Sequence, residues 1–133
     1  MEAVIHLDTH VVVWLYAGRV DLLPPPVRAL VEQEEIAISP IVLLELQYLR
    51  ETGRIQSDPL AIIDDLGRVI EMTVSCSAFD EVIREACRQT WTRDPFDRMI
   101  VAHARVDAVR LLTKDRTIRR NYQKALWPRR ADY

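Results

Sequence analysis

The sequence predicts an α/β fold built on a central, mostly parallel β-sheet that helices cover. Two observations support this class. Four short apolar runs have the length and composition of buried strands, and the segments between them repeat apolar residues at helical spacing. Parallel neighbours need crossover connections, which the helical segments would supply. At 133 residues the chain is expected to form one domain, residues 1–133.

The expected strands are AVIHL, IAIS, VIEMTV and VRLLT, at residues 3–7, 36–39, 69–74 and 109–113. In open parallel sheets, ligands bind beyond the carboxyl ends of the strands, where loops and helix N-termini converge. Polar residues that directly follow a strand are therefore the first candidates for a functional site.

Helix boundaries can be predicted from prolines and capping residues. Three prolines at 24–26 form a stiff corner before a helix, and Ser39 followed by Pro40 is typical of the start of a helix over 41–52 that stops at Gly53. Ser77 with Asp80 resembles a capping box for a helix over 78–90. Asp94 before Pro95 is a good N-cap, and Asp97 is then the third helical residue, where negative charge is favoured.

Composition excludes several classes of protein. Hydrophobic content is 49% and charged content 29%, which is typical of a globular chain, and no apolar run approaches the roughly 20 residues of a membrane helix. The N-terminus lacks the basic region of a signal peptide, so a cytoplasmic protein is expected. Cys76 and Cys87 have no metal-binding spacing and are expected to be buried or incidental thiols.

Charge is unevenly distributed. The net charge of −2 argues against a protein that coats nucleic acid by bulk attraction. The segment 110–133 nevertheless holds eight basic and two acidic residues, so the rest of the chain carries −8. Charge alone favours a solvated surface for this segment, and a phosphate-binding edge is the alternative.

Four carboxylates are expected to meet in one pocket. Asp8 and Asp115 follow the first and fourth strands, Glu45 lies on the helix after the second strand, and Asp97 opens a helix whose Met99, Ile100 and His103 should face inward. Capping alone would also explain Asp94 and Asp97. Like charges about 4 Å apart repel by about 4 kcal/mol at an effective dielectric constant of 20, so such a cluster needs a cation or must bind protons. Ligands that are all oxygens favour Mg²⁺ or Mn²⁺ over zinc.

The same segments, in the same order, resemble a known family. IHLDTHVVVWL, ISPIVLLELQYL, DPFDRMIVAHA and LLTKDRTI are similar to the motifs of the PIN-domain ribonucleases, and within them of the VapC toxins of toxin–antitoxin pairs. The resemblance spans the whole chain and implies a PIN-like fold with helices on both faces of the sheet. It places the catalytic and metal-binding acids at Asp8, Glu45, Asp97 and Asp115.

The resemblance also implies supporting roles. Thr9 and Thr113 lie beside the acids and are expected to hydrogen-bond them or a metal-bound water, and Asp94 is a cap close enough to assist. His103 stands where this subgroup often has Gln, and we interpret it as a histidine of the core or one that supports the acids from behind, not as a metal ligand. The expected contacts to the RNA backbone are Arg98, Lys114, Arg116, Arg119 and Arg120, although for each alone a solvated or structural side chain is the commoner state.

The implied function is endonucleolytic cleavage of RNA that depends on Mg²⁺, with Mn²⁺ as an alternative. One or two ions would position the scissile phosphate and activate a water, leaving a 5′ phosphate and a 3′ hydroxyl. The implied partners are a second copy of the chain and a VapB-type antitoxin, through which alone the protein would contact DNA. An antitoxin arginine that enters among the carboxylates would compete with the metal. Candidate side chains for the interfaces with the antitoxin or the second copy are Trp14, Trp91 and Trp127, although a tryptophan more often packs in the core.

Two other functions are compatible with an aspartate after the first strand. One is a metal-dependent phosphatase or phospho-acceptor domain, but the sequence lacks the second acid two residues beyond Asp8 and the acidic pair before it that those classes use. The other is a catalytically silent interaction domain, which would more readily have lost one of the four acids.

Overall fold

A computed structural model describes residues 4–129 of the chain. Its centre is a sheet of five strands, all parallel, in the order β3-β2-β1-β4-β5. The strands are β1 (Val4–Leu7), β2 (Glu35–Ile38), β3 (Thr73–Val74), β4 (Arg110–Leu112) and β5 (Ala125–Leu126). The predicted α/β class with a parallel sheet is confirmed.

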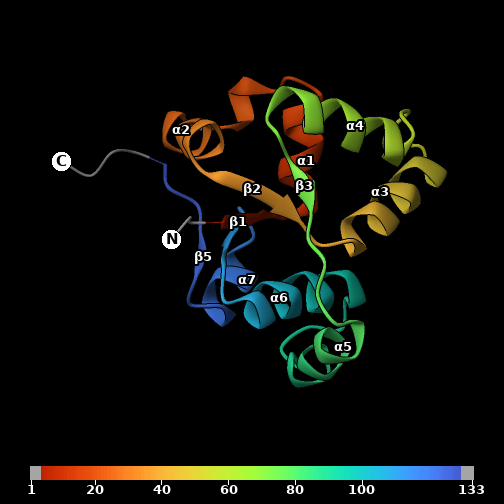
Figure 1. The fold of residues 1–133 in the computed structure, drawn as a ribbon, viewed down its shortest axis with the longest axis vertical. Coiled ribbons are helices and arrows are strands. Elements are labelled where there is room, and N and C mark those ends of the chain that lie inside the picture. The colour runs from red at the N-terminus through yellow and green to blue at the C-terminus, as the bar shows by residue number, and fades with distance from the viewer. Residues whose placement is uncertain (1–3, 130–133) are drawn as a thin grey trace.

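Helices cover both sides of this sheet. They are α1 (Thr9–Tyr16), α2 (Pro25–Gln33), α3 (Ile41–Glu51), α4 (Pro59–Val69), α5 (Phe79–Arg88), α6 (Pro95–Asp107) and α7 (Arg116–Asn121), with a 3₁₀ turn η1 (Val20–Leu22) before α2. In Figure 1, α1 to α4 lie on one side of the sheet and α5 to α7 on the other. Among residues 4–129, no helix has both the length and the apolar character needed to cross a bilayer.

The core is formed by the central strands. Ile5 pairs with Ile36, and Leu7 with Leu112, and all four side chains are buried. Full burial of such a side chain contributes roughly 1.5–3 kcal/mol to the stability of the fold, so the central strands are stably packed. The residues that follow the strand ends are therefore held in fixed relative positions.

The third expected strand was wrong. Val69 is the last residue of α4, and only Thr73 and Val74 pair with β2. The physical reason is that Ile62 and Leu66 recur at helical spacing and are buried, which extends α4 through Val69. The first and second strands lie within one residue of the expected bounds where described, and Ala3 lies outside the described residues. The fourth is shorter, and β5 was not expected at all.

Two predicted helix caps were also wrong. Pro40, not Ser39, precedes α3, and the Ser39 hydroxyl lies 2.8 Å from His103 Nδ1 instead. The start of α5 has no side-chain cap, because the Ser77 hydroxyl donates to Asp107 Oδ1 at 2.5 Å. Both hydroxyls are engaged by α6, a tertiary contact that local sequence patterns do not report.

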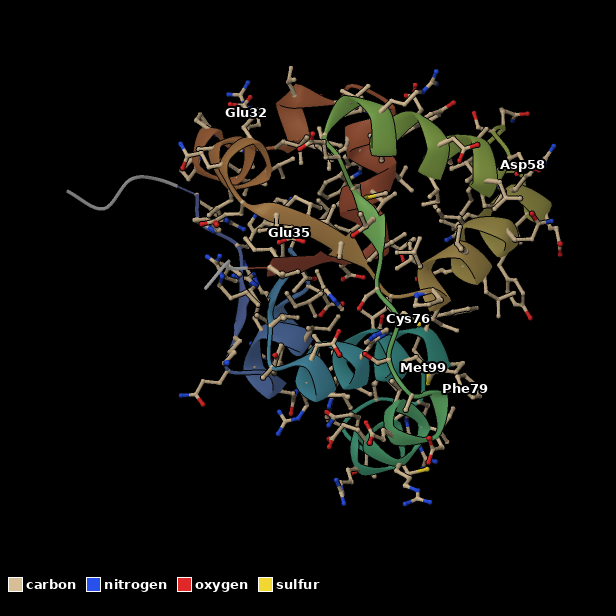
Figure 2. All side chains as sticks on the ribbon, viewed as in Figure 1. Glu32, Glu35, Asp58, Cys76, Phe79 and Met99 are labelled. Atoms are coloured by element: carbon tan, nitrogen blue, oxygen red, sulfur yellow. The ribbon has the colours of Figure 1, made fainter. Side chains whose placement is uncertain are left out.

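The cysteines are free and exposed. Cys76 lies on the segment between β3 and α5 (Figure 2), and Cys87 lies near the end of α5. Of the two expected alternatives, buried or incidental thiols, the exposure of both side chains excludes the first.

Candidate active site

Asp8 directly follows β1 and is buried, with 4% of its surface exposed. Its side chain caps α1 by accepting a hydrogen bond from the Thr9 amide at 2.8 Å. Its other oxygen accepts from the Thr113 hydroxyl at 2.6 Å. Asp8 is therefore held from both sides by residues that follow two neighbouring strands.

Asp115 follows β4 and caps α7. Its Oδ1 accepts from the Ile118 amide at 3.0 Å, and its own amide donates to the Thr113 hydroxyl at 3.1 Å. A single threonine thus contacts both Asp8 and Asp115.

Glu45 comes from α3 and is partly buried. It accepts a hydrogen bond of 2.5 Å from the Thr9 hydroxyl. Burial raises the pKa of Glu45, the Thr9 hydrogen bond lowers it, and the charges of Asp8 and Asp94 raise it further. The net shift is upward, as expected for a carboxylate among other acids.

Asp97 lies in the first turn of α6, and its pKa is the most clearly shifted of the four acids. Burial and, after it, the charges of Asp8, Asp94, Asp115 and Glu45 together raise its pKa to about 7. Asp97 is therefore close enough to every other acid of the set for their charges to affect it. At neutral pH its carboxyl group is poised between the protonated and ionised states.

All four acids line one pocket of about 390 Å³. Asp8 and Asp115 follow two strands, as predicted, and Glu45 and Asp97 come from two helices. We call this cavity the acid pocket. Thr9 also lines it, whereas Thr113 supports it from a fully buried position behind Asp8 and Asp115.

Asp94 has the predicted capping role. Its Oδ1 accepts from the Phe96 amide at 2.8 Å and from the Asp97 amide at 3.2 Å. Asp94 does not line the acid pocket, but its charge raises the pKa of both Asp97 and Glu45. It therefore positions the helix that carries Asp97 and adds to the negative field around it.

His103 lies in the core, as predicted. Its imidazole is buried, contacts Ser39 and packs at 5.2 Å from the ring of His6. It does not line the acid pocket.

His10 was missed by the sequence analysis. It lines the acid pocket, its Nδ1 lies 3.4 Å from Asp8 Oδ2, and its Nε2 accepts from the Lys114 amide at 3.0 Å. It also packs against Trp14 and Trp127. Its position two residues after Asp8, on the first turn of α1, was the available signal.

Among described lysines and arginines, Arg54 is the one that lines the acid pocket, and it was not among the predicted RNA contacts. Arg98 instead donates to the Thr92 carbonyl, and Arg119 donates to the Lys114 carbonyl. Lys114, Arg116 and Arg120 are exposed outside the pocket. Part of the basic C-terminal segment, residues 130–133, lies outside the described residues.

The candidate interface tryptophans are engaged within the described part of the chain. The rings of Trp14 and Trp127 lie 6.1 Å apart, and Trp127 is buried. Trp91 is partly buried and donates to the Gln89 side chain.

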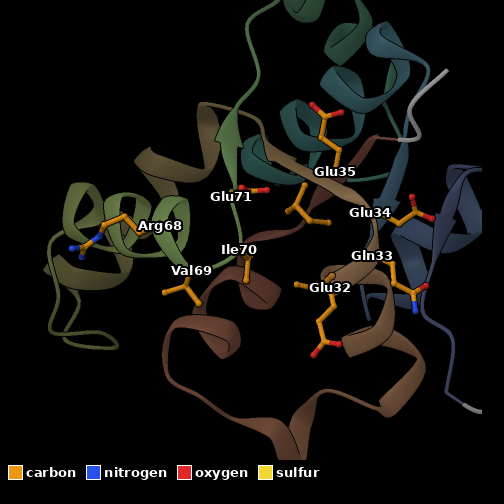
Figure 3. A pocket seen from close by; sticks show the side chains of 10 residues that line it. Glu32, Gln33, Glu34, Glu35, Arg68, Val69, Ile70 and Glu71 are labelled. Carbon is orange, nitrogen blue, oxygen red and sulfur yellow. The ribbon is translucent and has the colours of Figure 1, made fainter.

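A larger pocket lies elsewhere on the molecule. It measures about 790 Å³ and is lined by residues at the end of α2, the start of β2 and the end of α4 (Figure 3). Glu32 and Glu35 point in opposite directions there, and Arg68 extends away from the other labelled side chains. The pocket lies at the amino end of β2, opposite the edge where Asp8 and Asp115 gather, so size alone does not identify the functional site.

Comparison with known proteins identifies the family to which the chain belongs. The family model of the PIN domain matches residues 5–124. Ribonuclease VapC22 of Mycobacterium tuberculosis is 32% identical over 115 residues, which cover 85% of this chain and 88% of the relative.

Two solved structures have the same fold. VapBC2 from Rickettsia felis, bound to a DNA fragment from its promoter, has a TM-score of 0.63 and 23% identity over 88% of this chain and 92% of the other. VapBC-1 from nontypeable Haemophilus influenzae has a TM-score of 0.59 and 16% identity over 94% and 96%. The family match covers four of the five strands, apart from Val4, and every acid of the pocket, and the chain therefore belongs to the PIN-domain family.

Proposed function

We propose that this protein is a divalent-metal-dependent endoribonuclease and the toxin of a type II toxin–antitoxin pair. The observation that carries the proposal is that four carboxylates from four separate segments line one pocket of a PIN domain. The similarity to a relative named as a VapC ribonuclease supports the same activity.

The acids would hold the metal, with Asp8 and Asp97 as principal ligands and Glu45 and Asp115 completing the set. Burial is the largest cause of the raised pKa of Asp97, and the charges of Asp8, Asp94, Asp115 and Glu45 raise it further. A divalent cation would offset that negative charge. Within residues 4–129, no three acidic, histidine or cysteine side chains already converge on one ion position. The proposed ligands are all carboxylate oxygens, a donor set that favours Mg²⁺ or Mn²⁺ over zinc.

A bound ion would supply Lewis-acid chemistry, polarising the scissile phosphate and increasing the acidity of a water. The protein's own contribution is to hold the acids. Thr113 fixes Asp8, Thr9 fixes Glu45, and Asp94 fixes the first turn of α6. Either Glu45 or Asp115 is left to orient the attacking water. Since water attacks in place of the ribose 2′-hydroxyl, the expected products carry a 5′ phosphate and a 3′ hydroxyl.

The proposed partners are a VapB-type antitoxin and a second copy of the chain. Structural neighbours that are VapBC complexes support the first. Exposed apolar side chains on α3 and α5 support an interface where these two helices line a common pocket. They are Leu44, Tyr48, Phe79 and Ile83. Phe79 is 71% exposed and lies beside Met99 (Figure 2), next to an apolar pocket of about 260 Å³. An RNA substrate and such an antitoxin imply action in the cytoplasm.

RNA cleavage by the purified protein, freed of antitoxin, tests this function. In Mg²⁺ the wild type should cut a mixture of tRNA and rRNA to fragments with 5′ phosphates. Asp8→Asn should lower the rate at least about 100-fold, as expected when a principal metal ligand is lost. Asp64→Asn, an exposed acid of α4 outside the acid pocket, is the matched control and should cut like the wild type. Equal cleavage by Asp8→Asn and wild type would refute the proposal, and phosphate labelling of Asp8 by a phosphate donor would favour a phospho-acceptor instead.

A further inference from the structure

We propose that Arg54 binds an RNA backbone phosphate at the mouth of the acid pocket. This inference rests on the proposed ribonuclease function and adds a residue that the sequence motifs do not mark. Three observations about Arg54 carry it: its location, its lack of a partner, and the backbone turn that holds it.

The location sets Arg54 apart from the other basic residues. Within residues 4–129 it is the single lysine or arginine that lines the acid pocket, which Leu49 and Ile55 also line. A phosphodiester that approaches four carboxylates meets strong repulsion, which a metal offsets at the reacting phosphate. A guanidinium at the rim would offset it for a phosphate of the entering strand, and its planar fork suits two phosphate oxygens.

Arg54 also has no partner in the described part of the chain. Its neighbour Arg50 pairs with Asp58 at 2.9 Å, and eight further arginines make a hydrogen bond or ion pair. No hydrogen bond or ion pair joins Arg54 to a described residue. The positive charge of Arg54 remains available to an anionic ligand.

The backbone holds Arg54 in place. Helix α3 ends in a Schellman turn, in which the Gly53 amide donates to the Arg50 carbonyl at 3.0 Å and the Arg54 amide donates to the Leu49 carbonyl at 2.8 Å. Gly53 has a φ of +79°, the left-handed conformation that such a turn requires. The turn reverses the chain after α3, and Arg54 lines the same pocket as Leu49 of that helix. The side chain is thus presented from a fixed backbone position.

Binding of single-stranded RNA tests the proposal without depending on turnover. The probe is a fluorescein-labelled 20-nucleotide RNA of random sequence, titrated in Mg²⁺ against the full chain in an Asp97→Asn background. Adding Arg54→Gln should weaken binding about 5- to 10-fold. It should also lower the slope of log affinity against log salt by about 0.7, the value for one phosphate contact to a single strand. Arg54→Lys should retain the slope while losing part of the affinity, since it keeps the charge and loses the fork.

Arg84→Gln is the matched control, because Arg84 is an exposed arginine on α5, away from the acid pocket. It should leave affinity and slope unchanged, and all variants should melt within a degree or two of the parent. Cleavage is measured in parallel with the native Asp97. If the wild type does not cleave RNA, the proposed function fails and the Arg54 proposal fails with it. If the wild type cleaves while Arg54→Gln matches Arg84→Gln in affinity and salt slope, the Arg54 proposal alone is overturned.

Discussion

The Thr113 hydroxyl donates to Asp8 at 2.6 Å, although 105 positions separate the two residues in the chain. The contact exists because β1 and β4 pair in parallel, with Leu7 opposite Leu112, so the residues after each strand emerge side by side. The same hydroxyl accepts from the Asp115 amide. One buried threonine therefore couples two of the four acids.

Replacing Thr113 by Val should damage both stability and activity. The change removes the hydrogen bond to Asp8 and leaves the Asp115 amide without its partner, which costs about 1–3 kcal/mol for a buried group. RNA cleavage should fall at least about 10-fold because Asp8 is no longer fixed. Thr113→Ser keeps the hydroxyl and should restore most of the activity. Thr117→Val, at an exposed threonine of α7, should behave like the wild type in both denaturant unfolding and cleavage.

Asp97 should make the metal-free protein less stable as the pH rises. Its pKa is about 7 in the folded state against 3.8 for the unperturbed group. Between these values the folded state keeps the proton while the unfolded state has released it, so this group's contribution to stability is present below about pH 4 and is lost by about pH 7. In EDTA at pH 8, Asp97→Asn should therefore be more stable than the wild type by about 1 kcal/mol, a value reduced for solvent screening.

Urea unfolding at pH 5 and pH 8 measures this difference, with Asp64→Asn as the control for loss of a carboxylate elsewhere. The difference in free energy of unfolding between Asp97→Asn and the wild type should be larger at pH 8 than at pH 5. The difference between the control and the wild type should not change with pH. A difference between Asp97→Asn and the wild type that stays constant with pH would contradict the assignment of a raised pKa to Asp97.

His6 should make the protein less stable as the pH falls, the reverse of the pH dependence expected from Asp97. It is 1% exposed, and burial lowers its pKa to about 4, helped by the charge of His103 and opposed by Asp107. A lowered pKa means that the unfolded state takes up the proton first, so stability is lost as the pH falls from 6.5 towards 4. His6→Phe should remove about 2–3 kcal/mol of this loss between pH 7 and pH 4.5. Thermal melts of both proteins across that range provide the measurement, and parallel curves would show that His6 does not titrate as described.

Two glycines offer a matched test of the turn that carries Arg54. Gly53→Ala forces a side chain into the left-handed region and should cost about 1–2 kcal/mol, although nothing lies within 4 Å of the added carbon. Gly67→Ala lies inside α4, where alanine is favoured, and meets only the Met72 carbonyl at 3.4 Å. It should be neutral or stabilising. Equal losses in both variants would mean that the Gly53 conformation is not what holds the turn.

The sequence was sufficient to predict those parts of the site that strand ends determine. Asp8 and Asp115 had to share an edge once their strands were parallel, and Asp97 was anticipated because Ile100 and His103 bury the same helix against the sheet. His10 and Arg54 could not be found this way. His10 is held at the pocket by its hydrogen bond from the Lys114 amide, and Arg54 by the turn after α3. Neither contact produces a periodic pattern of apolar residues in the sequence.

The two wrong helix caps are explained by tertiary contacts, and the strand errors have other causes. Ser39 and Ser77 have the local pattern of helix caps, but His103 and Asp107 on α6 engage their hydroxyls. The run after Gly67 was interpreted as a strand because Val69, Ile70 and Met72 are apolar, whereas Val69 completes α4. Strand β5 has two residues, too few for an alternating pattern to be recognised.

Titration of the metal-free protein with Mn²⁺ at pH 8, followed by the electron paramagnetic resonance signal of the free ion, tests most directly whether the four acids act together. The wild type should take up Mn²⁺, and Asp8→Asn, Glu45→Gln, Asp97→Asn and Asp115→Asn should each weaken that binding about 10-fold or more, while Asp64→Asn leaves it intact. Wild-type affinity in all four variants would contradict the account, because the carboxylates would then share a cavity without sharing an ion.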